Sequence, residues 1–153
     1  MKTLALIIGL FLGNILLAQE VIYNNGLYFQ NNVAYTGKHT IYFAGGSIKE
    51  ILTISEGKLN GEMIKYYENG AVQETGHFEN NLKFGLWSRY NVSGALIAEA
   101  SYKNDKKDGA WMVYDEKGHK LFKMEYKDGE KTGTWTQWDE NGSVVKSTNY
   151  ASL

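Results

Sequence analysis

The sequence predicts an all-β protein: one elongated, twisted, antiparallel sheet of five 24-residue β-hairpin repeats, preceded by a capping hairpin. Glycines recur every 24 residues, five times in succession, and aromatic residues recur with the same period. Between them, apolar and polar residues alternate with a period of two, which is the side-chain period of a β-strand. Aromatic residues make up 14% of the 153-residue chain, a composition that favours strands.

Two columns of glycine define the repeat. The first column consists of Gly37, Gly61, Gly85, Gly109 and Gly133. The second column, nine residues later in each unit, consists of Gly46, Gly70, Gly94, Gly118 and Gly142. We interpret all ten as structural turn glycines. They divide the chain into units at 37–60, 61–84, 85–108, 109–132 and 133–153.

Each unit is interpreted as a hairpin with two kinds of turn. Clusters such as Glu116-Lys117-Gly118 predict a type I turn that closes with glycine in the left-handed conformation. Pairs such as Asn104-Asp105 predict two-residue hairpin turns, because these residues tolerate positive φ. A helical alternative fails, because no stretch of 11 residues beyond the N-terminal segment has apolar residues at helical spacing.

Residues 19–36 precede the first glycine of the repeat and depart from its pattern. Short apolar runs at 21–23, 27–29 and 33–35 are separated by Asn-rich turns. We expect an atypical hairpin here that caps the array, since a terminal repeat unit lacks a neighbour on one side.

Residues 1–18 are typical of a secretory signal peptide. Lys2 supplies a positive start, an almost wholly apolar run extends from Thr3 to Leu17, and small and polar residues begin at Ala18. The run is shorter than the roughly 20 residues that span a bilayer, which argues against a transmembrane anchor. We therefore expect cleavage after Ala18, no membrane span in the mature chain, and export to the periplasm, the outer-membrane surface or the medium.

The sequence indicates no enzyme, metal centre or cofactor site, so we predict no catalytic, metal-ligating or cofactor-binding residues. The chain has no Cys, and its three histidines, His39, His77 and His119, fall at different positions of the repeat. Metal sites need several converging donors, so we interpret these histidines as surface or strand-end side chains. The net charge of −1 argues against nucleic acid as a partner.

Two charged runs, residues 103–108 and 127–131, mix lysine with acidic residues. We interpret them as solvated hairpin ends that discourage edge-to-edge pairing of sheets. A phosphate-binding stripe would need unpaired positive charge, and we expect the neighbouring acids to cancel most of it.

Two aromatic columns form the candidate interaction surface. Two residues after the first-column glycine stand Trp87, Trp111 and Trp135. Five residues after it stand Tyr90, Tyr114 and Trp138. Equivalent rings two strands apart should repeat about every 10 Å. Strict alternation places the two columns on opposite faces, whereas a bulge or strong curvature would bring them to one face. The rings form either a packed structural ladder or a ladder that binds a partner.

These columns resemble the variant MORN repeat of bacteria. The segments that carry the resemblance best are 109–118 (GAWMVYDEKG) and 126–129 (YKDG), and the resemblance extends over roughly residues 28–150. The first two units depart from it, with His39 and Met63 in place of Trp. Proteins with this repeat include the YwqK-family antitoxins, and MORN-type repeats otherwise resemble scaffolding and protein- or lipid-contact modules. The family has no catalytic motif to carry over.

Together these features predict an exported, non-enzymatic repeat protein that presents an extended surface for protein–protein interaction or scaffolding. We expect another protein as the partner. One alternative is a glycan-binding module of the cell envelope, suggested by aromatic rings about 10 Å apart. A second alternative is a YwqK-like antitoxin or immunity protein, with which a signal peptide fits poorly.

Overall fold

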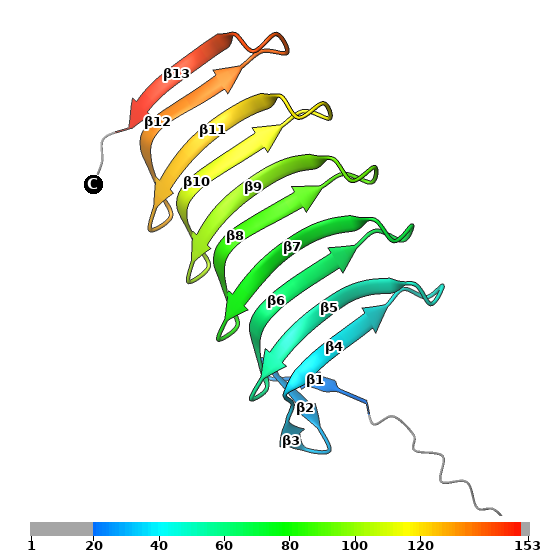
Figure 1. Ribbon diagram of the computed structural model, residues 1–153. Coiled ribbons are helices and arrows are strands. Elements are labelled where there is room, and N and C mark those ends of the chain that lie inside the picture. Colours follow the sequence, from blue (N-terminus) through cyan, green and yellow to red (C-terminus); the bar gives the residue numbers. More distant parts are fainter. Residues whose placement is uncertain (1–19, 151–153) are drawn as a thin grey trace, which may run out of the picture.

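The computed structural model describes residues 20–150. The predicted signal peptide, residues 1–18, therefore lies outside the described residues. Within residues 20–150 the chain forms strands and turns, and no helix there is long and apolar enough to cross a membrane. Ten strands form one long antiparallel meander, in which each strand pairs with its neighbours in sequence (Figure 1). The predicted all-β fold and elongated antiparallel sheet are confirmed.

The strands belong to two sheets. The small sheet consists of β1 (Ile22–Asn24), β2 (Leu27–Gln30) and β3 (Val33–Ala34). The large sheet consists of β4 (Gly37–Tyr42), β5 (Ile48–Ser55), β6 (Lys58–Tyr66), β7 (Val72–Glu79), β8 (Leu82–Tyr90), β9 (Leu96–Lys103), β10 (Lys106–Tyr114), β11 (Lys120–Lys127), β12 (Glu130–Trp138) and β13 (Val144–Tyr150). The hairpins β4–β5, β6–β7, β8–β9, β10–β11 and β12–β13 correspond to the five predicted units.

The turn inside each hairpin is closed by a glycine of the second column. In the fourth unit, the Gly118 N–H donates to the Asp115 carbonyl oxygen at 3.1 Å, and Gly118 has a φ of 85°. The Asp115 carboxylate accepts hydrogen bonds from the N–H groups of Lys117 and His119, each at 2.8 Å. All the second-column glycines have positive φ, as a turn closed by glycine requires.

The turns between strands such as β9 and β10 are two-residue turns that also link successive units. Asn104 and Asp105 have φ values of 49° and 64°, as a type I′ turn requires. The Asp105 N–H donates to the Lys83 carbonyl oxygen at 3.1 Å, and the Asp105 carboxylate accepts from the Lys83 N–H at 2.7 Å. The corresponding backbone bonds join Gly57 to Tyr35, Asn81 to Leu59 and Gly129 to Lys107.

The first-column glycines are not turn residues, which corrects the sequence-based interpretation. The five lie inside strands: Gly37, Gly61, Gly85, Gly109 and Gly133. Between Lys107 and Trp111, β10 has three residues where its partner β9 has one, so β10 bulges there. Gly109 occupies this bulge with a φ of 108°, and a Cβ atom on it would lie 3.2 Å from the Ser101 Cβ. The bulge and the close approach of β9 explain why glycine is needed.

The N-terminal segment is a three-stranded meander and not the single hairpin that we predicted. Two turns with consecutive positive φ values, Asn25-Gly26 and Asn31-Asn32, reverse the chain twice. β1 pairs with β2, and β2 pairs with β3. Two type I′-like turns within so short a segment leave room only for strands of two to four residues.

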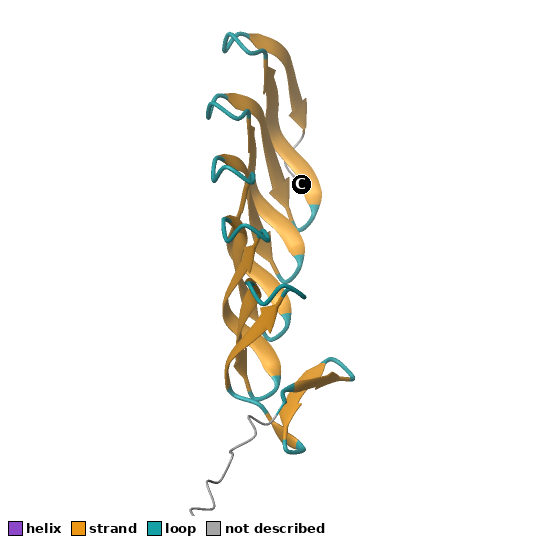
Figure 2. Ribbon diagram, turned by 90° about the vertical axis from the view of Figure 1, so that its right-hand side faces the viewer, coloured by secondary structure: helices purple, strands orange, loops and turns teal. Residues whose placement is uncertain are grey.

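The small sheet packs on one face of the array. It does not pair with β4, which remains an edge strand of the ten-stranded sheet. Figure 2, which shows the large sheet nearly edge-on, shows the small sheet projecting to one side at the N-terminal end. The Tyr28 N–H donates to the Gly57 carbonyl oxygen, and the Gly57 N–H donates to the Tyr35 carbonyl oxygen, each at 2.8 Å. The small sheet is therefore joined to the turn between β5 and β6.

The hydrophobic core lies under this cap. Leu52, Ile54, Met63 and Trp87 form the buried cluster. Tyr28 and Tyr35 of the capping segment, among others, pack against it. The smaller residues His39 and Met63 stand in the tryptophan column where the cap approaches, and the Tyr28 ring lies 5.9 Å from the His39 ring. The cap thus fills the space that a tryptophan fills in the later units.

Candidate interaction face

The tryptophan column lies on one face of the large sheet, which we call the ladder face. Its rings alternate with aromatic rings of the neighbouring strands, which are Phe78, Tyr102, Tyr126 and Tyr150. The ring centroids of Trp111 and Tyr126 are 5.8 Å apart, those of Tyr126 and Trp135 are 5.1 Å apart, and those of Trp135 and Tyr150 are 4.9 Å apart. Trp87 contacts Phe78 and Tyr102 edge-on, whereas the rings of the later units are tilted toward one another. The rings of the two sets of strands thus pack against one another as a ladder.

A lysine stands over each tryptophan of the ladder. The Nζ atoms of Lys83, Lys107 and Lys131 lie 3.8, 3.4 and 4.5 Å from the ring centroids of Trp87, Trp111 and Trp135. Each Nζ also lies 4.8 to 5.3 Å from the next tyrosine ring. These are cation–π contacts. Sequence reasoning missed this lysine column, although a lysine two residues before the first-column glycine recurs in the last three units.

The tryptophans of the column differ in how far their side chains are buried. Trp87, nearest the cap, is 3% exposed, whereas Trp111 and Trp135 are half-buried. The Trp135 indole N–H donates to the Glu125 carbonyl oxygen at 3.0 Å, which fixes the ring on β11. Burial also lowers the pKa of the Lys107 ammonium below its ordinary value. The accessible part of the ladder therefore begins at Trp111.

The second predicted column lies on the opposite face of the sheet. The register shift at Arg89/Tyr90 adds its extra residue, Ile97, to β9, so residues of β8 still alternate from Trp87 to Tyr90 and the two columns stay on opposite faces. The Tyr114 hydroxyl donates to a Glu99 carboxylate oxygen at 2.9 Å, and burial together with this bond raises the pKa of Tyr114. The other two members, Tyr90 and Trp138, occupy equivalent positions. The candidate surface of six residues is thus two separate surfaces.

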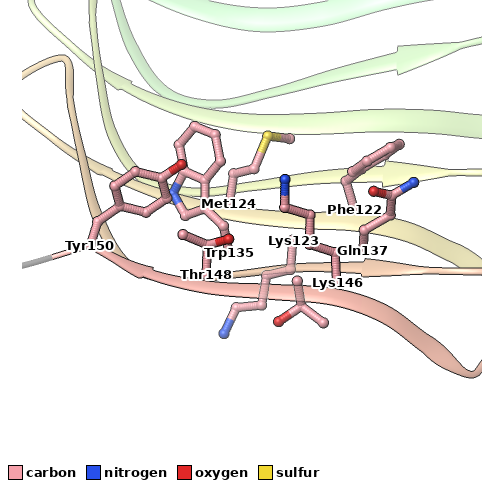
Figure 3. Close-up of a pocket in the computed structure, with 9 residues that line it drawn as sticks. Phe122, Lys123, Met124, Trp135, Gln137, Lys146, Thr148 and Tyr150 are labelled. Carbon is pink, nitrogen blue, oxygen red and sulfur yellow. The ribbon is translucent and has the colours of Figure 1, made fainter.

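The ladder face is hollowed toward its C-terminal end. An open depression of about 290 Å³ lies over β11, β12 and β13. Figure 3 shows Phe122, Met124, Trp135, Gln137 and Tyr150 on the same side of the sheet at this depression. A second depression of about 200 Å³ on the same face is lined by residues that include Lys83, Trp87 and Trp111. Both hollows border the aromatic ladder.

The three histidines lie apart, as their sequence positions indicate. His39 contacts Tyr28, His77 lies on the opposite face, and His119 lies 3.0 Å from the Asp115 carboxylate within a turn. Within residues 20–150, no group of three His, Asp or Glu side chains is placed to hold a metal ion.

Comparison with known proteins identifies the repeat. The family model for the MORN repeat variant matches residues 59–80, 107–128 and 131–151. Each match begins two residues before a first-column glycine, which for two of them is a lysine of the ladder, and the unmatched unit between them has the same hairpin geometry. The chain is a MORN-repeat protein. No curated protein sequence matches it. MORN repeats commonly bind proteins or membranes, which agrees with an extended, uncovered sheet face.

Proposed function

We propose that this chain is an exported, non-enzymatic MORN-repeat protein that binds another protein through its ladder face. The proposal is supported by the extent of the cap, which covers only the N-terminal part of the ladder face. Within residues 20–150 the small sheet is the only second layer, and it covers the core around Leu52, Ile54 and Met63. Beyond Trp87 the ladder stays half-buried, with its hollows open. Accessible, fixed aromatic rings are the side chains that contribute most to protein interfaces.

Binding through this face is tested by photocrosslinking from matched positions in the full chain. A photoreactive side chain at Gln137 on the ladder face should give a protein adduct in the producing cell. The same group at Thr134, which is exposed on the opposite face, is the control and should give none. Equal adducts from both positions, or none from Gln137, would contradict the proposal.

Trp111 separates a binding role from a structural one. Trp111→Ala should abolish the Gln137 adduct, whereas Trp111→Tyr should retain part of it because the ring remains. Thermal melts of both variants show whether the sheet remains folded. An alanine variant that melts as the wild type does and still gives the full adduct would remove Trp111 from the binding surface.

Export belongs to this proposal and rests on residues 1–18. Mass spectrometry of the chain from its own cell should find an N-terminus near Gln19 or Glu20. Intact Met1 on a cytosolic protein would contradict export and favour the antitoxin alternative.

A glycan partner receives less support from the ladder. Sugar rings stack on the open faces of aromatic side chains, and here lysine ammonium groups occupy those faces, at 3.4 Å for Lys107 over Trp111. A glycan would have to displace the lysines first. Protein remains the partner that we propose.

A further inference from the structure

Charged side chains are sorted between the two faces of the sheet from β8 to β13. Four acidic residues occur in these strands: Glu99, Asp108, Glu125 and Glu130. They lie on the face opposite the ladder. Glu99 accepts from Tyr114, Asp108 pairs with Lys127, and Glu125 pairs with Lys123.

The charged residues on the ladder face of the same strands are all basic: Lys83, Arg89, Lys107, Lys131 and Lys146. None of these five forms an ion pair with a residue of the described part of the chain, 20–150. On this face Glu74 of β7 is the cross-strand partner of Arg89, and both line the depression. The expectation that acids cancel the lysines of residues 103–108 and 127–131 is therefore wrong for Lys107 and Lys131, because alternation places their acidic neighbours on the other side of the sheet.

The lysines that cap the tryptophans are evenly spaced. Lys83, Lys107 and Lys131 lie on β8, β10 and β12, two strands apart each time. Neighbouring strands lie about 4.8 Å apart, so these ammonium groups repeat about every 10 Å along the sheet. They form a basic row beside aromatic rings and open hollows.

A polyproline II segment matches this row. Its helix has three residues per turn and rises about 3.1 Å per residue, so every third side chain points the same way at about 9.3 Å intervals. A β-strand fails to match, because residues three apart point to opposite sides. Polyproline II segments also dock on aromatic-lined grooves, since their conformation is preformed.

We propose that the ladder face of β8–β13 binds an extended, polyproline II peptide segment with an acidic side chain at every third position. The carboxylates pair with Lys83, Lys107 and Lys131, which remain over the tryptophans, and the proline rings lie in the hollows beside the ladder. This proposal rests on the proposed function and names the chemistry of its partner.

A membrane surface with anionic headgroups fits the face less well. Membrane binding is strengthened by apolar side chains that project beyond the charges and insert among the lipids. The most exposed large apolar residues of the repeat array lie elsewhere: Tyr42 at the end of β4, Leu86 on the opposite face, Val92 in a turn, and Val144 and Val145 near the start of β13. On the ladder face beyond the cap, Phe122 is the one so exposed among the described residues, at 36%.

Fluorescence anisotropy with labelled synthetic peptides and the purified full chain tests the proposal. The probe is a peptide of four Glu-Pro-Pro triplets. One control has the same composition with its glutamates grouped at one end, and the other has Lys in place of Glu. We expect the triplet peptide to bind at least about tenfold more tightly than the grouped peptide, and the lysine peptide not to bind. Equal binding of the triplet and grouped peptides would overturn the proposal.

The lysines are tested with charge-matched variants. K83Q/K107Q/K131Q should weaken binding of the triplet peptide about tenfold or more, and K83R/K107R/K131R should retain it, because Arg keeps the charge and the ring contact. K106Q/K117Q/K120Q removes three exposed lysines that lie outside the ladder row and should change affinity less than about twofold. Unchanged binding by the first variant would overturn the proposal, and melts show whether each variant is folded.

Binding to phosphatidylglycerol vesicles tests whether the partner is a membrane instead of a peptide. Vesicle binding through the same lysines without peptide binding would assign the row to lipid and overturn the proposal. Absence of peptide binding would not contradict the proposed function. The Gln137 adduct and its loss in Trp111→Ala test protein binding and need no acidic partner. A ladder-face adduct with no peptide binding would leave protein binding standing and remove only the acidic segment.

Discussion

Gly76 of β7 shows how a single residue makes room for the ladder. It lies beneath the indole of Trp87, and a Cβ atom built on it would meet ring carbons at less than contact distance. The equivalent position in the neighbouring unit holds Ala100, which is also small and buried. Trp87 can pack flat on β7 because this position lacks a side chain.

Gly76→Ala should therefore destabilise the fold by about 1–3 kcal/mol, the usual cost of overpacking a rigid core. Urea unfolding followed by Trp fluorescence measures the change. Gly45→Ala is the matched control, because Gly45 lies in a turn without positive φ and with nothing within 4 Å of the added atom. A urea midpoint for Gly76→Ala equal to that of the control would show that Trp87 repacks freely.

Asp108 makes the stability depend on pH. Hydrogen bonds from the Lys127 ammonium and the Asp128 N–H, at 3.0 and 3.2 Å, hold the pKa of this carboxyl below its ordinary value. The unfolded chain then binds the proton more readily than the folded one, so this contribution is complete above the unfolded pKa of about 3.9 and is lost as pH falls through the folded pKa.

Asp108→Asn should accordingly melt below the wild type at neutral pH, and the gap should close in acid, below about pH 4. Calorimetry across that range measures it. Glu116→Gln, at an exposed turn position, is the control and should show no such convergence. A gap that stays constant down to the lowest pH would mean that the carboxylate charge contributes nothing.

At the scale of elements, the type I′ turns hold the hairpins in register. Asn81 and Asp105 are the second residues of two such turns, and each side chain accepts a hydrogen bond at 2.7 Å from the N–H of a residue in the preceding unit. Asn81 makes one bond more, from its amide nitrogen to the Gly26 carbonyl oxygen of the cap at 3.1 Å. The cap is thus attached to the second unit as well as to the first.

Asn81→Gly and Asp105→Gly isolate these side-chain bonds, because glycine adopts the positive φ and occurs at the equivalent positions 57 and 129. Asp105→Gly should cost about 1 kcal/mol and Asn81→Gly about twice that, with the same backbone entropy penalty in both. Chemical denaturation gives the difference. Equal losses would show that the bond to Gly26 does not help to hold the cap.

At the scale of the whole molecule, the hairpin repeat is the unit that can be removed. Deleting residues 85–108 joins the first half of β8 to the second half of β10 and keeps both strand direction and phase. Deleting residues 85–96 joins β8 to β9, which runs the other way. Stability in repeat proteins is close to a sum of unit and interface terms.

The first deletion should give a folded protein with a somewhat lower melting temperature, and the second should lose cooperative melting. Circular dichroism and thermal melts compare the two. Equal damage from both deletions would contradict the 24-residue unit.

Much of this architecture could be read from local patterns. The turn pair Asn104-Asp105 requires positive φ, and Gly118 closes its turn, so both turn types and the strands between them follow from neighbouring residues. Alternation along β10 also places Trp111 and Tyr114 on opposite faces, because the register shift at Val113/Tyr114 adds its extra residue to β11 and not to β10. The cap was harder to predict, because its two turns are local but its docking against Gly57 depends on contacts distant in sequence.

The sequence by itself therefore determined the period, the five hairpins, the turn chemistry and the existence of an aromatic ladder, because each depends on residues within one unit. Only the tertiary structure decided that Gly109 lies in a strand bulge, that Lys107 stands over Trp111, and that acids and lysines separate between the faces. The physical reason is that a bulge exists only relative to a paired strand. The same pairing places Lys107 over Trp111 and Asp108 against Lys127, so the charge of the ladder face emerges only when neighbouring units pair.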